Sequence, residues 1–414
     1  MKFALVNPPW TFDGSIYFGC REPHLPLEYG YARVLLEREG HDVLLLDAQM
    51  HGLSLADVAE RLGAFAPDRL VVTTAPSYLF WRCPPPELRV PQELLAACAH
   101  LSTLRVVVGP HASTTPATTL QKLAADVAVL GECEETLPRL ALDPAEWERV
   151  SSIAYLRGSE TRVQGTPHVC DMSALPALVW TRDDLARHVH HHHRFDAAPS
   201  EPGAEMEVSR GCLRDDYRRR PLDVILTELD SLCLNGVEYV YFIDEIFLPY
   251  RELLEALVDR PIRFGIQTRI DLWSPASLEL LGRAGCVSIE AGVESITLEG
   301  RNLFDKGNRL TTEQIASRLI EAKQHVPFVQ ANLLESGADD ALDVEQWRER
   351  LRAHGVWANK PVPMFSYPGS PGYSRLWGAP DDRAWERAMD DYLARFGEFS
   401  DKQDARPRPL HELG

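Results

Sequence analysis

The sequence predicts an α/β protein in which a doubly wound, Rossmann-like domain precedes a partly closed parallel (β/α) barrel. Over residues 1–140, short apolar runs rich in leucine or β-branched residues alternate with amphipathic segments. This alternation is typical of buried parallel strands joined by helices. The same pattern resumes at Glu207 and continues to Leu334, with enough strand–helix units for a barrel.

The composition is that of a soluble globular protein with two or three domains. The chain has 414 residues, of which 45% are apolar and 25% charged. A formal charge of −18 argues against a general nucleic-acid binder, which needs a basic surface. No apolar run reaches the roughly 20 residues of a membrane span, and no signal peptide is evident. The eight cysteines show no CxxC spacing. We therefore expect a cytoplasmic protein with reduced thiols and neither nucleic-acid nor membrane partners.

The first predicted domain covers residues 1–140 and contains five buried strands. They are expected at Phe3–Val6, Val43–Leu46, Leu70–Thr73, Val106–Val108 and Val127–Leu130. Helices are expected between them at Tyr31–Glu39, Leu55–Phe65, Glu93–Leu101 and Thr118–Leu123. Ligands of doubly wound sheets bind at the carboxyl ends of the strands, so the loops that follow these strands are candidate binding segments.

The loops after the predicted strands combine glycine, proline, small hydroxyl residues and one histidine. They are Asn7-Pro8-Pro9-Trp10, Thr74-Ala75-Pro76-Ser77, Gly109-Pro110-His111-Ala112 and Gly131-Glu132-Cys133-Glu134. Such loops allow the backbone to approach a large flat ligand with amide and phosphate edges, although tight βα turns have the same composition. A GxGxxG fingerprint is absent, which argues against a nicotinamide cofactor.

This part of the chain resembles the cobalamin-binding domain that precedes many radical S-adenosylmethionine (SAM) barrels. The resemblance is carried by NPPW, PLEYGYARVLLEREGHDVLLLDAQ, VVVGPHAS and VLGECEETL. It implies cobalamin contacts from Asn7, Pro8, Thr74, Ser77, Trp81, Gly109, His111, Gly131 and Glu132. The DxHxxG motif is absent because Asp47 and His51 are misspaced for it, which implies cobalamin without a protein imidazole on cobalt. Trp81 lies in an aromatic, proline-ended segment that is either a lid over the corrin or a core turn.

Residues 141–205 form a predicted connector of different character. Ile153–Leu156 and Arg162–Gln164 flank Gly158-Ser159 and predict a β-hairpin. Further on, the run from His188 to His193 contains five histidines. This run is either a natural segment near the active site that binds a metal or a solvated loop, because no regular spacing specifies a coordination geometry.

The predicted barrel covers residues 206–365. A strand ending at Val208-Ser209 comes first, and further strands are expected at Val237–Ile243, Ile262–Gln267, Val287–Ala291 and Phe328–Leu334. Helices are expected at Leu222–Leu234, Leu253–Leu257, Leu278–Arg283 and Thr312–Lys323. Residues 366–414 form a C-terminal extension with a helix at Ala384–Phe396, a candidate for closing the barrel, and a loose tail.

Polar side chains cluster after three of the barrel strands. The groups are Asp244-Glu245, Gln267-Thr268-Arg269 and Glu290 to Ser295. Because functional side chains of such barrels gather at the carboxyl ends of the strands, the set predicts a polar ligand site. Mutual ion pairing is the alternative for any single member, since buried charges need a partner.

This second part resembles a radical SAM barrel, and nearly the whole chain is similar to one cobalamin-binding radical SAM subfamily. FIDEIFLP, FGIQTRIDLW, LLGRAGCVSIEAGVES and LFDKGNRLTTEQI carry the resemblance. It implies that Asp244 and Glu245 meet the methionine amine of SAM. Glu294 and Ser295 would then lie near its ribose and carboxylate, and Gln267 and Arg269 would line the same cavity.

One motif of the resemblance is missing. Radical SAM enzymes hold a 4Fe–4S cluster on CxxxCxxC after the first strand, whereas this chain has Cys212 followed by Asp216 and Arg219 at the later cysteine positions. An arginine is no ligand for iron. About a dozen residues of the subfamily's loop are absent between Cys212 and Arg214. We therefore expect Cys212 to be a remnant metal ligand, insufficient alone, and the cluster to be lost. Arg218 to Arg220 form a cationic cluster or the start of a surface helix.

Two functions remain from these observations. In the first, the chain is a SAM- and cobalamin-dependent methyltransferase that acts on a small molecule by polar transfer. A variant of this hypothesis is a standard radical methyltransferase whose cluster loop has been lost by the excision. A reductant would then be a further partner. In the second, it is a non-catalytic cobalamin-binding protein, a carrier or partner of an intact paralogue. The cofactors implied are cobalamin and SAM.

Overall fold

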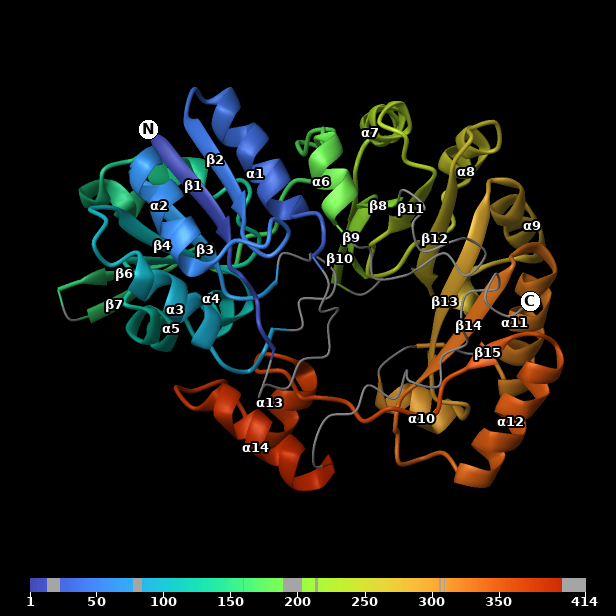
Figure 1. The fold of residues 1–414 in the computed structure, drawn as a ribbon. Helices are drawn as coiled ribbons and strands as arrows, with labels where there is room; N and C mark the ends of the chain where they lie inside the picture. The colour runs from blue at the N-terminus through green and yellow to red at the C-terminus, as the bar shows by residue number, and fades with distance from the viewer. Residues whose placement is uncertain are drawn as a thin grey trace. The chain divides into compact units, whose positions relative to one another are not determined.

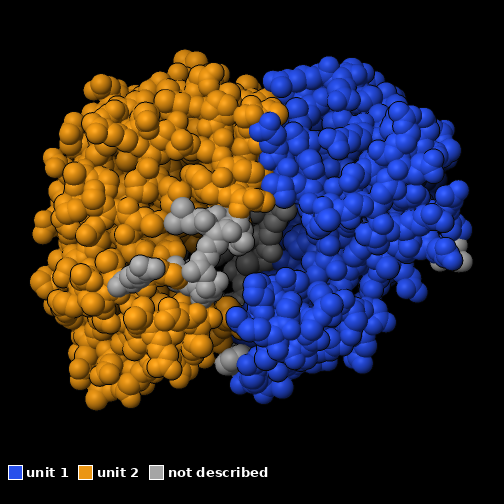
Figure 2. Space-filling model, turned by 180° about the vertical axis from the view of Figure 1, so that it is seen from behind, with its two compact units in different colours: residues 1–171, 365–399 blue, residues 172–364, 400–414 orange. Residues whose placement is uncertain are grey.

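A computed structural model describes residues 1–12, 23–76, 84–158, 160–188, 203–212, 215–304, 307–308 and 310–396. These residues form two compact units, coloured separately in Figure 2. Unit 1 comprises Met1–Asp171 and the C-terminal segment that begins at Phe365, and unit 2 comprises Met172–Met364. The C-terminal segment thus packs with the first unit, whereas the sequence suggested that it closes the barrel.

Unit 1 is built on a seven-stranded sheet with the order β2-β1-β3-β4-β5-β6-β7 (Figure 1). The first five strands in this order are parallel, and β6 and β7 are antiparallel. The strands are β1 (Lys2–Asn7), β2 (Asp42–Asp47), β3 (Arg69–Thr73), β4 (Leu104–Val108), β5 (Val127–Val129), β6 (Ile153–Arg157) and β7 (Glu160–Gln164). The doubly wound prediction is confirmed, and the strand order reverses between β1 and β3, where such folds bind ligands.

Two apolar cores, one on each face of this sheet, explain why the five parallel strands have nearly continuous apolar sequences. Ala4 and Val6 belong to one core, and Phe3 and Leu5 to the other, because successive side chains of a strand point to opposite faces. The helices of this part are α1 (Leu27–Arg38), α2 (Leu55–Phe65), α3 (Arg89–Ala97), α4 (Pro110–Thr114) and α5 (Pro116–Leu123), with 3₁₀ turns at Pro138–Ala141 and Pro144–Arg149. Helix α3 begins earlier than predicted because Pro91 is accommodated in its first turn.

The C-terminal segment of unit 1 adds α13 (Pro371–Trp377) and α14 (Ala384–Phe396). A separate apolar cluster holds these helices together, with Phe365, Tyr373 and Tyr392 buried in it. Helix α14 matches the predicted range, but its packing partner was not evident from its sequence.

Unit 2 is an open barrel of six parallel strands in the order β15-β14-β13-β12-β11-β8 (Figure 1). The strands are β8 (Gly203–Met206), β11 (Tyr239–Phe242), β12 (Arg263–Thr268), β13 (Cys286–Glu294), β14 (Phe328–Leu333) and β15 (Trp357–Ala358). The helices are α6 (Arg182–Arg187), α7 (Leu222–Leu234), α8 (Arg251–Leu257), α9 (Pro275–Arg283), α10 (Leu298–Leu303), α11 (Thr312–His325) and α12 (Ala341–Ala353), with a 3₁₀ turn at Ile270–Leu272. The predicted partial (β/α) barrel is confirmed.

A two-stranded antiparallel hairpin, β9 (Ser209–Cys212) and β10 (Asp215–Arg219), follows the first barrel strand. The sequence did not predict this hairpin, and the suggested helix start at Arg218 to Arg220 is wrong. The first barrel strand ends at Met206, and Ser209 begins β9 instead of ending a strand. Within the described residues, no helix combines the length and apolarity needed to cross a membrane.

Candidate functional site

The carboxyl ends of β1 and β2 are joined by a buried polar network. The Asn7 amide donates to Asp47 Oδ1 at 3.0 Å, and the Trp10 indole donates to Asn7 Oδ1 at 2.7 Å. The backbone N–H of Met50 also donates to Asp47 Oδ1, at 2.8 Å. Asn7 therefore orders this strand end, and Pro8 beside it is buried.

The ends of β3 and β4 approach each other closely. The Thr74 hydroxyl donates to the Val108 carbonyl at 3.0 Å, and its side chain is fully buried. Gly109 has φ +103°, and a Cβ atom there would lie 2.9 Å from Thr74 Oγ1. A glycine is needed at this position both for its backbone conformation and for the space.

The end of β5 is held by a second chain segment. Gly131 donates its N–H to Ser113 Oγ at 2.9 Å and forms a parallel bridge with His168. Glu132 accepts the backbone N–H of Cys170 at 2.7 Å. Three of the predicted cobalamin residues, Asn7, Thr74 and Glu132, thus make side-chain hydrogen bonds within unit 1.

His111 lies beneath the C-terminal helix α14. Its ring stacks on Trp385 with 3.9 Å between centroids, and the Trp385 indole donates to Thr115 Oγ1 at 3.0 Å. Burial lowers the pKa of His111 to about 3, although nearby backbone groups of Thr74 and Pro86 oppose this shift. Neither ring nitrogen makes a well-aligned hydrogen bond, so His111 is a neutral, packed side chain. Only the fold reveals this contact, because 270 residues separate Thr115 and Trp385.

We expect this histidine to make unit 1 less stable as the pH falls. An unfolded chain binds a proton on His111 near pH 6.5, whereas the folded chain does so only near pH 3. Stability contributed by the neutral ring is complete above pH 6.5 and declines through the window from 6.5 to 3. Between pH 7.5 and 5.5, the free energy of unfolding should fall by about 1.4 kcal/mol more in the wild type than in His111→Gln. Denaturant unfolding at the two pH values measures this difference, and substitution of the exposed His100 in His100→Gln is the control. An equal pH dependence of the unfolding free energy in all three proteins would contradict the low pKa of His111.

In unit 2, Asp244 follows β11 and is enclosed by the segment that leads into the hairpin. The backbone N–H of Val208 donates to Oδ1 at 2.8 Å, and the Ser209 hydroxyl donates to Oδ2 at 2.5 Å. Burial raises the pKa of the Asp244 carboxyl to about 8, against the opposing effect of these hydrogen bonds. Asp244 therefore fixes the start of β9 relative to β11, while the side chain of its neighbour Glu245 is exposed.

Two buried ion pairs anchor the hairpin. Arg210 contacts Glu207 through two hydrogen bonds of 2.7 and 3.1 Å. Arg220 lies within 2.6 Å of Glu228 on α7, and its side chain is 0% exposed. Charged groups are buried in this way only when their partners compensate for lost hydration. The cationic cluster expected at Arg218 to Arg220 is thus divided, with Arg220 serving as a structural anchor.

The ends of β12 and β13 hold the remaining predicted residues. Arg269 pairs with Asp271 at 3.1 and 2.6 Å, and Gln267 is partly buried. Glu294 has φ +61°, the left-handed region that non-glycine residues rarely occupy. A Cβ atom on Gly292 would lie 2.8 Å from Glu294 Oε1, so this glycine leaves room for the carboxylate.

Ser295 is part of a closed loop after β13. Its hydroxyl donates to Asp339 Oδ1 at 2.7 Å, and Thr297 donates to the same oxygen from its N–H and its hydroxyl at 3.1 and 2.7 Å. Arg301 donates to the carbonyls of Ser295 and Ile296 at 3.1 and 2.8 Å. Ser295 therefore orders the loop that directly follows Glu294, the last residue of β13.

Comparisons with known proteins agree with this architecture. No model of a protein family matches the chain. The structure is similar to the radical SAM methyltransferase TsrM from Kitasatospora setae, solved with cobalamin and a 4Fe–4S cluster bound, with TM-score 0.68 and 18% identity over 90% of this chain and 76% of TsrM. The cobalamin-dependent SAM radical enzyme OxsB gives TM-score 0.65 and 19% identity, and this chain spans 57% of OxsB. The fold of this chain is therefore that of TsrM and OxsB.

A sequence relative carries the name of a methyltransferase. A protein named uncharacterized methyltransferase PH0819, from Pyrococcus horikoshii, is 22% identical over 348 residues, which cover 78% of this chain and 72% of that protein. The predicted resemblance to the cobalamin-binding radical SAM fold is therefore confirmed at the level of fold.

The radical SAM fold makes the position of Cys212 informative. Cys212 is the last residue of β9 and pairs across the hairpin with Asp215 and Asp216, so only two residues separate the strands. Arg219, at a later cysteine position of the motif, lies on β10 with its guanidinium 3.6 Å from the Tyr250 ring centroid. Among the described side chains, no three cysteines converge on one point. Cys212 is the one cysteine in the sequence of the hairpin segment 209–219.

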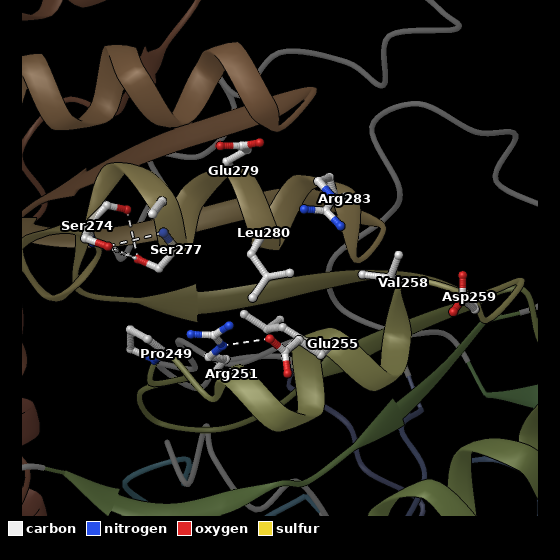
Figure 3. Close-up of a pocket in the computed structure, with 12 residues that line it drawn as sticks. Pro249, Arg251, Glu255, Val258, Asp259, Ser274, Ser277, Glu279, Leu280 and Arg283 are labelled. Carbon is white, nitrogen blue, oxygen red and sulfur yellow. Dashed lines mark hydrogen bonds and ion pairs between the residues drawn. The ribbon is translucent and has the colours of Figure 1, made fainter.

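A groove on the outer helical layer of unit 2 is lined by none of the residues predicted to bind cobalamin, SAM or a metal. Figure 3 shows it between α8 and α9, with Arg251, Glu255, Glu279 and Arg283 on its walls. Charges of both signs line it, and Arg251 already pairs with Glu255 at 2.7 Å. The predicted residues Ser77 and Trp81, and the histidine run beyond His188, lie outside the described residues.

Proposed function

We propose that this chain binds cobalamin at the carboxyl edge of the unit 1 sheet and transfers a methyl group from SAM to a small molecule by polar chemistry, without a cluster. The hairpin after the first barrel strand is the observation that carries the proposal. Only two residues of the sequence separate its strands, which are anchored by the Arg210–Glu207 and Arg220–Glu228 pairs, and the parallel strands of both units are present. The similarity to TsrM and PH0819, both of which are named as methyltransferases, supports methyl transfer as the reaction.

The edge of the unit 1 sheet suits a large flat ligand. It lies where the strand order reverses, and Gly109 and the neighbouring Thr74 keep the strand ends close together. Cobalamin, when bound, supplies a metal centre that accepts and donates a methyl group. His111 offers it no ligand, because its ring is packed under Trp385. We infer that cobalamin is held chiefly by backbone groups and has no protein imidazole on cobalt.

The mouth of the unit 2 barrel supplies the anionic groups that a cationic SAM molecule needs. Glu245 is exposed after β11, Glu294 is the last residue of β13, and Gln267 lies on β12 between these two strands. Glu294 is held in a left-handed conformation, and strained residues of this kind concentrate at functional sites. We assign Glu245 and Glu294 to the SAM amine and ribose. Asp244, Arg269 and Ser295 position the loops around them.

A non-catalytic, cobalamin-binding carrier is the second candidate. It is favoured by the internal bonding of Asp244, Arg269 and Ser295, since side chains reserved for SAM would keep their polar atoms available. Loss of a catalytic loop from a well-formed barrel is also what a partner of an intact paralogue would show. A reductant would then be unnecessary.

Binding of the two cofactors by the full-length chain separates these candidates. We expect about one cobalamin per chain after anaerobic loading and gel filtration, with an absorption spectrum that lacks nitrogen ligation by the protein. Calorimetry should then detect SAM binding that Glu294→Gln weakens by about 10-fold or more, because a charge-assisted hydrogen bond contributes about 1.5–3 kcal/mol. Exposed Glu299→Gln is the matched control. Cobalamin binding without SAM binding at millimolar concentration would favour the carrier, and absence of both would refute both candidates.

A further inference from the structure

Two chain segments of unit 1 are locked together beyond the end of β5. The backbone N–H of His168 donates to the Leu130 carbonyl at 2.8 Å, and the N–H of Glu132 donates to the His168 carbonyl at 3.0 Å. Gly131, between them, has φ +82°, and a Cβ atom there would lie 2.3 Å from the His168 carbonyl oxygen. Any other residue would separate the segments, so the side chains that follow are held on a rigid frame.

Three different metal-binding side chains converge on this frame. Their ligand atoms, the Glu135 carboxylate oxygen, an imidazole nitrogen of His168 and Cys170 Sγ, all lie within 4.8 Å of one another. The side chains of Glu135 and His168 are 22% and 20% exposed, whereas Cys170 is buried. The group thus combines a buried thiol with two partly exposed ligands, through which an ion can enter from solvent.

Neighbouring groups already orient these ligands. The N–H of Asp171 donates to Glu135 Oε2 at 3.3 Å, and the N–H of Cys170 donates to Glu132 Oε2 at 2.7 Å. The Cys170 thiol donates to Glu134 Oε2 at 3.4 Å. Hydrogen bonds of this kind hold metal ligands in place in proteins. The buried Glu134 carboxylate also provides an acceptor for the thiol proton of Cys170.

We propose that Glu135, His168 and Cys170 bind a zinc ion. Thiolate sulfur, imidazole nitrogen and carboxylate oxygen are the ligands that Zn²⁺ prefers, and three of them leave a fourth position for water. The ion replaces the contact between His168 Nε2 and Glu135 Oε2, which lie 2.6 Å apart. Ligands at zinc distances are about 3.3 Å apart, so these side chains need to separate by only several tenths of an ångström. Binding releases the thiol proton of Cys170 and changes no oxidation state. The site does not depend on the function proposed above.

Zinc content and a thiolate spectrum test the site in the full-length chain. After chelator treatment, zinc reloading and gel filtration, elemental analysis should find about one zinc per chain. Titration with Cd²⁺ should produce the ultraviolet charge-transfer band of a cadmium thiolate. Cys170→Ser should abolish this band, and His168→Asn should lower the affinity for zinc about 100-fold or more. Cys233→Ser, which alters a thiol on α7, is the control and should change neither the band nor the zinc affinity.

Glu135→Gln provides a second, milder variant, because it keeps the shape of the side chain and removes its charge. It should weaken zinc binding about 10-fold or more while circular dichroism remains that of the wild type. A wild-type chain that retains less than about 0.1 zinc, or binding that is unchanged in both His168→Asn and Glu135→Gln, would overturn the proposal. In that case the group is a hydrogen-bonded His–Glu pair beside a buried thiol.

Discussion

The full-length chain, purified anaerobically with iron and sulfide supplied, should carry no stoichiometric 4Fe–4S cluster and should not cleave SAM to 5′-deoxyadenosine. Three thiolates must converge on such a cluster, and the hairpin offers Cys212 in β9 with only two residues before β10. Arg219 lies over the Tyr250 ring and would repel an iron ion. We therefore expect the yield of 5′-deoxyadenosine with dithionite to equal that of a protein-free blank.

Insertion of a cysteine loop is the matching gain-of-function experiment. Replacing residues 213–214 with a loop that completes CxxxCxxC should raise the iron content toward about four per chain. The same insertion with serines in place of the added cysteines controls for loop length. About four irons per chain in the unmodified protein, together with 5′-deoxyadenosine formation, would show that the hairpin does not prevent cluster assembly.

Arg220→Met should destabilise the barrel unit by about 3–5 kcal/mol, because it leaves the Glu228 carboxylate buried without its cation. Arg220 also donates to the carbonyls of Glu207 and Pro176 at 2.8 and 2.7 Å, so it joins three chain segments. Among the hydrogen bonds of the described residues, Glu228 then retains the one from the N–H of Leu178, at 2.7 Å. Urea unfolding followed by fluorescence and circular dichroism measures the change.

Two further variants test the reason for this loss. Arg220→Met combined with Glu228→Leu should recover much of the stability, since an apolar pair can replace a buried ion pair. Arg251→Met removes an exposed arginine from its pair with Glu255 and should cause no measurable change. A destabilisation by Arg220→Met as small as that of Arg251→Met would mean that Arg220 is not the anchor of the hairpin.

Local sequence patterns were sufficient to predict several of the helices and strands. Helices α2 and α7 occupy the predicted ranges Leu55–Phe65 and Leu222–Leu234, because apolar side chains at helical spacing lie between clear terminal signals. The strand at Phe3–Val6 was predicted from its continuous apolar run, which both faces of a covered parallel sheet require. These signals lie within a few residues of one another and need no knowledge of distant segments.

The candidate site depended on contacts between distant residues. The end of β4 carries the predicted residue His111, but Trp385 covers it, and the sequence held no sign of that pairing. The predicted residue Asp244 is likewise bound to Ser209, 35 residues earlier. A polar residue at a strand end is available to a ligand only if no other segment bonds to it, and sequence patterns do not report that competition.

By itself, the sequence determined that strands alternate with helices in both units, that most of these strands are parallel and that no cysteine stands at the later motif positions after Cys212, because each of these follows from nearby residues. Only the tertiary structure decided that Arg220 is a buried anchor, and that Glu135, 33 residues before His168, meets it beside Cys170. The physical reason is that burial and hydrogen bonding of a charged side chain are settled by whichever chain segments pack around it, and those segments are brought together only by folding.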